Sequence, residues 1–392
     1  MRVAVIGTGF AGGSHVEALR RIPGIEVAAL AGSSDARARA AAERLGVPNS
    51  TGDYRTLLAD AAIVAVHDCT PNDLHHEVTA AALEAGKHVL AEKPLAMDAA
   101  EAGDLVARAE RAGTVTGVCF NYRHYPLVAE ARTMLADGRA GRPHLIRGAY
   151  LQDWLLAPTD WNWRLVSERS GTSRAVGDIG SHWMDLIQHV TGRAIARVYA
   201  RLGRLHEERL RPAGPSQTFE RGGASDAERV VVDTEDFATV LFELDDGCPG
   251  VFTVSQVTPG RRNGLTFEID AGPVSLAWNQ EHPNALRIGR RDAANEVLVR
   301  DPALLSPAAA ALVHYPAGHE EGWPDGLKNL FLDFYAAVAA HGRGEAHESS
   351  VATFTDAHRI ARLVEAIVAS DRESRWVELT RGNPGFPREP PP

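Results

Sequence analysis

The sequence begins MRVAVIGTGFAGG (residues 1–13), and this stretch decides the fold of the first third of the chain. A short apolar run comes first, a segment with four glycines follows, and an amphipathic helical pattern starts directly after it. A strand, a glycine turn and a helix in this order are typical of a dinucleotide-binding site. We expect Gly7 to allow the tight turn, Gly9 to let a pyrophosphate approach the backbone, and Gly12 to let the helix pack closely on the strand. The N-terminus of the helix would offer N–H groups to the phosphates.

This pattern of strand and helix repeats through the first third of the sequence. Short, apolar strands that alternate with helices are typical of a parallel sheet with helices on both faces. We therefore predict an α/β fold in which residues 1–122 form a Rossmann dinucleotide-binding domain. Its further strands are expected at residues 25–30, 62–66, 88–91 and 114–118.

The second part of the chain has a different pattern. Successive alternating runs without helices between them predict an α+β domain, residues 123–375, with an open and mainly antiparallel sheet for substrate binding and oligomer formation. Residues 209–228 are rich in Pro, Gly and charge, which predicts a mobile loop or hairpin tip. We expect a disordered tail over residues 376–392. Two helices are expected at residues 326–340 and 351–369, and strands at 144–153, 195–205, 234–244, 250–257, 265–269 and 274–278.

Composition excludes several classes of protein. Hydrophobic residues make up 44% and charged residues 23% of the chain, as in soluble globular proteins. A net charge of -10 without a Lys/Arg cluster argues against nucleic-acid binding, and no segment has the roughly 18 apolar residues of a membrane helix. Three widely spaced cysteines predict neither disulfides nor a metal site. Because the first expected strand begins at residue 2, we expect no signal peptide and a cytoplasmic protein.

The motif Glu92-Lys93-Pro94 follows the fourth expected strand directly. It would lie at the carboxyl edge of the parallel sheet, where ligands of such sheets bind. Pro94 favours a fixed loop. Lys93 would then lie beside the nicotinamide of a cofactor bound at the glycine turn, although a lysine on a surface loop is the structural alternative.

A second set of candidate residues lies on an expected helix over residues 178–190. Asp178 and His182 are four positions apart and Asp185 follows three later, so we expect all three on one helix face. Histidine suits proton transfer near neutral pH, and a carboxylate one turn away can raise its basicity or orient a hydroxyl. Asp178 could instead cap the helix, and His182 could be a buried structural residue.

The end of the second expected strand bears on the choice of cofactor. NAD-dependent proteins usually place a carboxylate there for the ribose 2′-hydroxyl, but the sequence has no acid before Asp35. Ser33 and Ser34, with Arg37 close by, would admit a 2′-phosphate. We therefore predict NAD(P) as cofactor, with NADP favoured over NAD. NAD stays open because Asp35 could fold back.

Together, these motifs resemble the Gfo/Idh/MocA oxidoreductase family. The resemblance rests on GTGFAG (7–12), TPNDLH (70–75), EKP (92–94) and GDIGSH (177–182), at family-like spacing, and covers about residues 1–370. It implies a Rossmann domain joined to an open-sheet substrate domain. It also implies hydride transfer between NAD(P) and a carbinol of a sugar, sugar derivative or inositol.

The resemblance assigns roles to individual residues. Lys93, Asp178 and His182 would be the catalytic residues: His182 accepts the hydroxyl proton, Lys93 stabilises the developing alkoxide, and Asp178 orients the sugar or tunes Lys93. Whether Lys93 or His182 is the formal base stays open. The expected cofactor contacts are Gly7, Thr8, Gly9, Phe10, Ala11, Gly12, Ser33, Ser34, Arg37, Thr70, Pro71, Asn72, His75, Glu92, Lys93, Asn121 and Arg164. The expected substrate contacts are Lys93, Tyr122, Arg123, Gln152, Trp154, Trp163, Asp178, His182 and His319.

The stretches NYR (121–123) and YLQDW (150–154) resemble those of sugar dehydrogenases of the levoglucosan or inositol type. Two other functions stay open: a glycosidase or epimerase that uses bound NAD(P) without net redox, and a non-catalytic sugar sensor that binds NAD(P). The expected partner is a small sugar or polyol. Both sets of alternating residues in 237–242 are rather apolar, so we expect a homo-oligomer, either dimer or tetramer.

Overall fold

The computed structural model describes residues 1–214, 218–220 and 226–379. The first part of the chain forms a six-stranded sheet in the order β3-β2-β1-β4-β5-β6, in which every strand pair is parallel. This confirms the predicted Rossmann fold. The strands are β1 (Arg2–Ile6), β2 (Glu26–Ala31), β3 (Asn49–Thr51), β4 (Ile63–Asp68), β5 (His88–Ala91) and β6 (Thr116–Val118).

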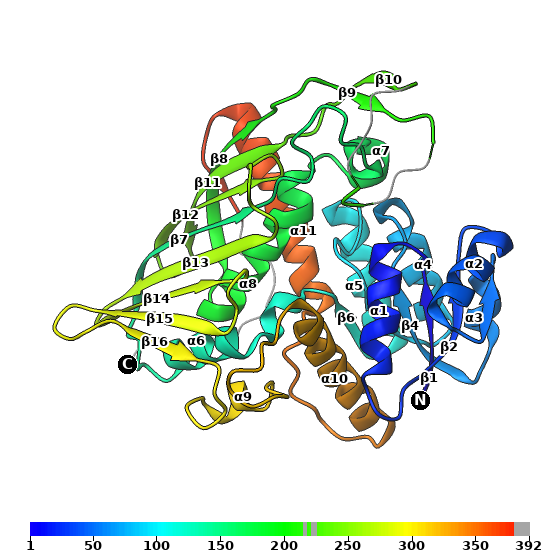
Figure 1. Cartoon of the computed structure of the whole chain (residues 1–392), viewed down its shortest axis with the longest axis horizontal. Helices are drawn as coiled ribbons and strands as arrows, with labels where there is room; N and C mark the ends of the chain where they lie inside the picture. The colour runs from blue at the N-terminus through cyan, green and yellow to red at the C-terminus, as the bar shows by residue number, and fades with distance from the viewer. Residues whose placement is uncertain (215–217, 221–225, 380–392) are drawn as a thin grey trace.

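Helices connect these strands and cover the sheet (Figure 1). Their starts follow local capping signals: Ser34 caps one helix and Asp98 another by accepting backbone N–H groups. The helices are α1 (Phe10–Arg20), α2 (Asp35–Leu45), α3 (Arg55–Ala59), α4 (Asn72–Glu84) and α5 (Ala99–Ala112).

The second part of the chain forms a nine-stranded sheet in the order β16-β15-β14-β13-β7-β12-β11-β8-β17. Only the β7–β12 pair is parallel among its described strands, so the prediction of a mainly antiparallel sheet is confirmed. The strands are β7 (Pro143–Leu151), β8 (Ile195–Gly203), β11 (Phe237–Leu244), β12 (Pro249–Ser255), β13 (Gly264–Ala271), β14 (Val274–Asn279), β15 (Ala285–Arg290), β16 (Glu296–Val299) and β17 (Val377–Glu378).

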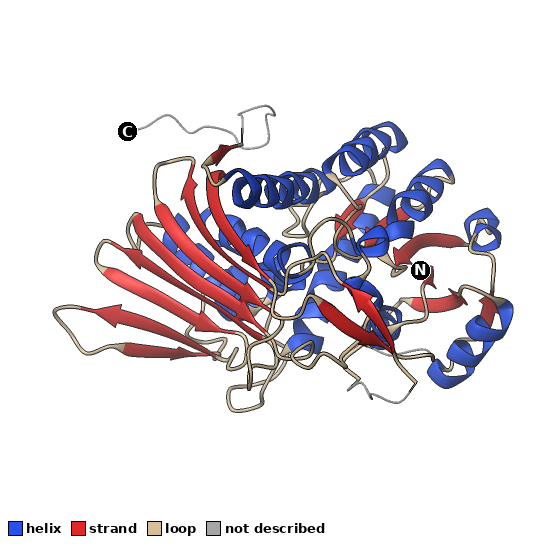
Figure 2. Ribbon diagram, turned by 90° about the horizontal axis from the view of Figure 1, so that it is seen from above, coloured by secondary structure: helices blue, strands red, loops and turns tan. Residues whose placement is uncertain are grey.

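Helices cover one face of this sheet, and none of the helices formed by the described residues lies on the other face (Figures 1 and 2). Alternation along β11 follows from this arrangement: Ala238, Val240 and Phe242 are buried, whereas Phe237 and Leu241 are exposed. The helices of this part are α6 (Pro126–Ala136), α7 (Ser167–Ser170), α8 (Ser181–Thr191) and α9 (Pro307–Ala310).

Two segments depart from the expected loop and tail. The region 209–228 is flanked by a two-stranded sheet of β9 (Glu208–Arg211) and β10 (Glu228–Val231), while residues 215–217 and 221–225 lie outside the described residues. The expected tail begins with β17, which pairs with β8, and residues 380–392 lie outside the described residues.

The last two helices, α10 (Trp323–Gly342) and α11 (Phe354–Glu373), return to the first sheet. Phe331 and Phe334 of α10 are fully buried in a cluster with residues of β1 and α1. The backbone N–H of Val118 in β6 donates to the carbonyl of Ala352, 2.8 Å away, and α11 packs between α5 and β8 (Figure 1). The C-terminal helices therefore join the two sheets. No helix in the described part of the chain is long and apolar enough to cross a membrane.

Candidate active site

The glycine turn after β1 (residues 7–12) forms the expected cofactor cradle, which is closely packed at Gly7 and Gly12 and open at Gly9. A Cβ atom at Gly7, whose φ is +124°, would collide with the Cys69 carbonyl, and one at Gly12 would collide with the Gly7 carbonyl. The predicted turn and close packing are thus confirmed. Among the described residues, apart from its own chain neighbours and the backbone of its helix, no atom lies within 4 Å of a Cβ built on Gly9, the N-cap of α1. This open space beside the N-terminus of α1 fits the pyrophosphate of a dinucleotide.

Exposed polar side chains follow β2. The Ser34 hydroxyl accepts the backbone N–H of Arg37 at the start of α2, and the Arg37 guanidinium donates to the Ser33 hydroxyl at 3.4 Å. The Asp35 carboxylate does not fold back toward the glycine turn. It accepts the backbone N–H of Gly52 at 2.6 Å, so it is engaged with the loop after β3.

Residues 70–75, which follow β4, contact the loop that carries Lys93 and the second part of the chain. His75 lies between two backbone carbonyls, with its ring nitrogens 2.8 Å from the Thr70 oxygen and 2.6 Å from the Pro94 oxygen. The Asn72 amide donates to the Ser170 carbonyl. The peptide bond before Pro94 is cis. These contacts fix the carboxyl edge of the first sheet against the second part of the chain.

Glu92, which precedes this lysine, is anchored in the first domain. Its carboxylate lies 3.1 Å from Nε2 of His15 and accepts the backbone N–H of Lys93. Burial alone would raise the pKa of Glu92, but the hydrogen bond from His15 and the nearby positive charge outweigh it and lower the pKa to about 2. An ionised Glu92 thus steadies the backbone at Lys93.

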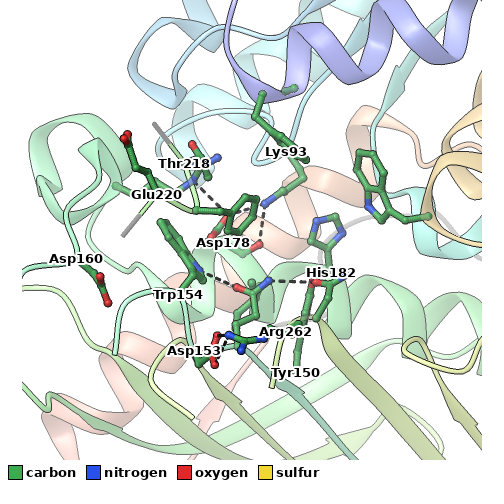
Figure 3. Close-up of a pocket in the computed structure, with 18 of the residues that line it drawn as sticks. Lys93, Tyr150, Asp153, Trp154, Asp160, Asp178, His182, Thr218, Glu220 and Arg262 are labelled. Atoms are coloured by element: carbon green, nitrogen blue, oxygen red, sulfur yellow. Dashed lines mark hydrogen bonds and ion pairs between the residues drawn. The ribbon is translucent and has the colours of Figure 1, made fainter. Parts of the chain in front are cut away.

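Lys93 and Asp178 form a half-buried ion pair between the two parts of the chain (Figure 3). The Lys93 ammonium donates to Oδ1 of Asp178 at 2.6 Å and to its backbone carbonyl at 2.9 Å. The Arg164 guanidinium lies 3.5 Å from the same carboxylate oxygen. Burial raises the pKa of the Asp178 carboxyl, but the charges of Lys93 and Arg164 outweigh burial and hold that pKa well below its usual range.

His182 points from α8 into a cavity that Lys93 and Asp178 also line (Figure 3). The Phe120 and Tyr122 rings pack nearly perpendicular to its imidazole, and its buried Nδ1 has no hydrogen-bond partner among the described residues. Burial and the charge of Lys93 lower the pKa of His182 to about 3. The ring is therefore neutral near pH 7.

A cavity of about 800 Å³ joins these groups to the cofactor cradle. Another unpartnered polar atom, Nδ2 of Asn121, belongs to a residue that lines it. The expected site residues that line the cavity are Phe10, Ala11, Glu92, Lys93, Asn121, Tyr122, Gln152, Trp154, Arg164, Asp178 and His182.

Three expected substrate contacts lie outside this lining. Arg123 is buried in an ion pair with Asp185, with its Nε 2.8 Å from the carboxylate. Trp163 packs under the Arg164 guanidinium at 4.5 Å, and His319 is exposed. Asp185 does not line the cavity either, because its carboxylate is held in the ion pair with the buried Arg123. A π-helical turn, Val176–Gly180, carries Asp178, and the regular helix α8 that follows carries His182 and Asp185.

The structure shows polar contacts that the sequence analysis did not predict. Asp153 and Arg262 form an ion pair at the cavity, with 2.6 Å between the carboxylate and guanidinium. The hydroxyls of Tyr122 and Tyr150 meet at 2.7 Å, and Gln256 donates to Asp178. Each contact joins segments far apart in the chain, so no local pattern indicates it.

Comparison with known proteins agrees with this geometry. A family model described as "Oxidoreductase family, NAD-binding Rossmann fold" matches residues 1–120, and one described as "GFO/IDH/MocA C-terminal domain" matches residues 128–272. The chain is 31% identical to levoglucosan dehydrogenase of Pseudarthrobacter phenanthrenivorans, over 97% of this chain and 98% of that protein.

Solved structures give the same result. A levoglucosan dehydrogenase in complex with NADH and L-sorbose is 30% identical, with a TM-score of 0.87 over 97% of this chain and 99% of the other. An inositol dehydrogenase homologue from Azotobacter vinelandii, in complex with NADH and myo-inositol, is 28% identical, with a TM-score of 0.83 over 97% of both chains. The chain therefore belongs to the Gfo/Idh/MocA family of NAD-dependent oxidoreductases.

Proposed function

We propose that this protein is an NAD(P)-dependent dehydrogenase that transfers hydride between a carbinol of a sugar, sugar derivative or inositol and the nicotinamide. The observation that carries the proposal is the meeting of Lys93, Asp178 and His182 in one cavity next to the glycine cradle. The similarity to levoglucosan dehydrogenase and to the inositol dehydrogenase homologue supports this substrate class.

In this proposal the protein binds, orients and deprotonates, and the bound nicotinamide supplies the hydride chemistry. Neutral His182 accepts the proton of the reacting hydroxyl. The Lys93 ammonium donates a hydrogen bond to the same oxygen and stabilises its developing negative charge. Asp178 holds Lys93 in place through the 2.6 Å ion pair. Asn121, Phe10 and the glycine turn would hold the cofactor.

We propose further that the enzyme favours NADP over NAD. Ser33, Ser34 and Arg37 are exposed beside the cradle, and the carboxylate of Asp35 is bound to Gly52. The site thus presents hydroxyls and a guanidinium to a 2′-phosphate. Ser33→Asp should shift the preference toward NAD, because the new carboxylate repels the 2′-phosphate. The ratio of kcat/KM for the two cofactors measures this, and an unchanged ratio would contradict the proposed role of this loop.

The proposed function is tested by absorbance at 340 nm with NAD or NADP against inositols, monosaccharides, anhydrosugars and glycosides. We expect NAD(P)H to accumulate with one class of compound. Glycoside cleavage or epimerisation without released NAD(P)H would instead show an enzyme with no net redox. Tight cofactor binding without any turnover would show a sensor, and either result would replace the proposed dehydrogenase.

A further inference from the structure

Behind the ion pair of Lys93 and Asp178 lies a glutamine that the cavity does not reach. Gln256 directly follows β12, is fully buried and is not part of the cavity lining. Its side-chain Nε2 donates to Oδ2 of Asp178 at 2.8 Å. Oδ1 of the same carboxylate accepts from Lys93. Asp178 is therefore held from two sides, by Lys93 at the cavity and by Gln256 from the protein interior.

The orientation of the Gln256 amide is determined by Arg174. This arginine is 1% exposed, and its Nη1 donates to Oε1 of Gln256 at 3.0 Å. A guanidinium has only donors, so the amide oxygen must face Arg174 and the amide NH₂ must face Asp178. Arg174 is itself fixed, because it pairs with Asp236 and donates to the Thr234 hydroxyl.

The backbone of Gln256 is fixed as well. Its N–H donates to the Asp236 carbonyl at 3.0 Å, and its carbonyl accepts the N–H of Leu155 at 3.1 Å. Asp236 also pairs with the buried Arg209 of β9. The amide thus has no freedom to turn around, and it presents only a donor to Asp178.

We propose that Gln256, oriented by Arg174, is a positioning residue that keeps Asp178 ionised and aligned with Lys93 during hydride transfer. A donor that cannot become an acceptor favours the carboxylate form of its partner. It also sets the plane of that carboxylate, so that Oδ1 faces Lys93. The inference rests on the proposed function, because it assigns Gln256 a role through the pair that the proposed dehydrogenase uses.

The isosteric substitution Gln256→Glu tests this role through the pH profile. It places a second carboxyl group within hydrogen-bond distance of Asp178, and two such groups share a proton only when the pH is low enough. With that proton, the introduced group can donate to Asp178; without it, the two charges repel. We expect the ratio of variant to wild-type kcat/KM to rise at least about tenfold when the pH falls from about 9 to about 6.

A ratio that is constant with pH would overturn the proposal, because a merely structural loss reduces activity equally at each pH. Gln256→Leu removes the donor altogether and should lower kcat about tenfold or more at every pH, with little change in KM for the cofactor. Gln188→Glu is the matched control. Gln188 is a buried glutamine of α8 whose amide is bonded at both ends, to Met184 and Ile195, and this variant should keep the wild-type pH profile.

A second readout does not depend on turnover. Acetic anhydride labels lysine amines, and peptide mass spectrometry gives the extent at Lys93. The ion pair should protect Lys93 in the wild type, and Gln256→Leu should be labelled several-fold faster at the same pH, whereas Gln188→Glu should not. If the wild type oxidises no sugar, the proposed dehydrogenase fails while labelling still decides the role of Gln256. If the wild type oxidises a sugar, but Gln256→Leu is labelled at the wild-type rate and Gln256→Glu keeps the wild-type pH profile, only the role of Gln256 fails.

Discussion

At the scale of single residues, the charge state of His182 and Asp178 determines what the cavity can do. His182 is neutral because burial and the charge of Lys93 disfavour its protonated form, and Asp178 is ionised because it faces two cations. A neutral imidazole thus lies beside an ammonium group that Asp178 holds in place. In the proposed mechanism, proton acceptance and alkoxide stabilisation belong to these two different side chains.

Separate substitutions of Lys93 and His182 test these proposed roles. Lys93→Ala and His182→Ala should each lower kcat roughly 100-fold or more, because each removes a proton-transfer or oxyanion-type group. Cofactor affinity, measured by NAD(P)H fluorescence, should change much less. His76 on α4 pairs with Asp104 outside the cavity, so His76→Ala should keep wild-type turnover. Full activity in either cavity variant would remove that residue from the mechanism.

The sequence indicated Lys93, Asp178 and His182 because each lies in a motif at the end of a predictable element. It could not indicate Gln256 or Arg262, because both act through side-chain contacts across the fold. Nor could the sequence indicate that Asp185 lies outside the cavity lining, because its ion-pair partner Arg123 is 62 residues away in the chain.

At the scale of elements, Gly9 in the turn after β1 and Gly13 in α1 are expected to have different roles. Gly9 adopts an extended backbone with negative φ, which alanine also adopts, and the space beside it is open. Gly9→Ala should therefore fold with an unchanged Tm but place a methyl group where the pyrophosphate approaches. We expect the Kd for NAD(P)H to rise about tenfold or more, equivalent to about 1.4 kcal/mol.

Gly13 provides the matched control in the same helix. Its nearest neighbour to a built Cβ is a side-chain atom of Leu45 at 4.0 Å. Gly13→Ala should leave the cofactor Kd unchanged and raise stability by about 0.5–1 kcal/mol, because alanine loses less entropy than glycine in a helix interior. Equal cofactor affinity in Gly9→Ala and Gly13→Ala would contradict the predicted role of Gly9.

Elements with a strong apolar period were predicted well, and short or polar ones were not. Five strands of the first sheet and the central strands of the second follow the expected runs closely. The sequence analysis missed β3, which is an edge strand, polar and only three residues long. It also missed β15 and the two edge strands of the second sheet, β16 and β17. Edge strands bury fewer side chains, so their sequences carry a weaker pattern.

At the scale of the whole molecule, the uncovered face of the second sheet supports the proposed homo-oligomer. Leu241 is 45% exposed there, on β11, which is paired with a strand on each side. We expect a dimer or tetramer by size-exclusion chromatography with light scattering, and Leu241→Arg should shift the mass toward the monomer, because it places a charge on an apolar contact. Leu304→Arg, at an exposed loop position, should not. A monomeric wild type would defeat this proposal.

The return of α10 and α11 to the first sheet has a consequence for synthesis of the chain. The Rossmann strands are complete when Val118 leaves the ribosome, but Phe331 and Phe334, which cover their apolar face, and Ala352, which pairs with Val118, follow more than 200 residues later. At about 5–20 residues per second, that face stays uncovered for roughly 10 to 50 s. We expect nascent chains stalled before α10 to be cleaved readily by protease within the first sheet, and chains that include α11 to resist it.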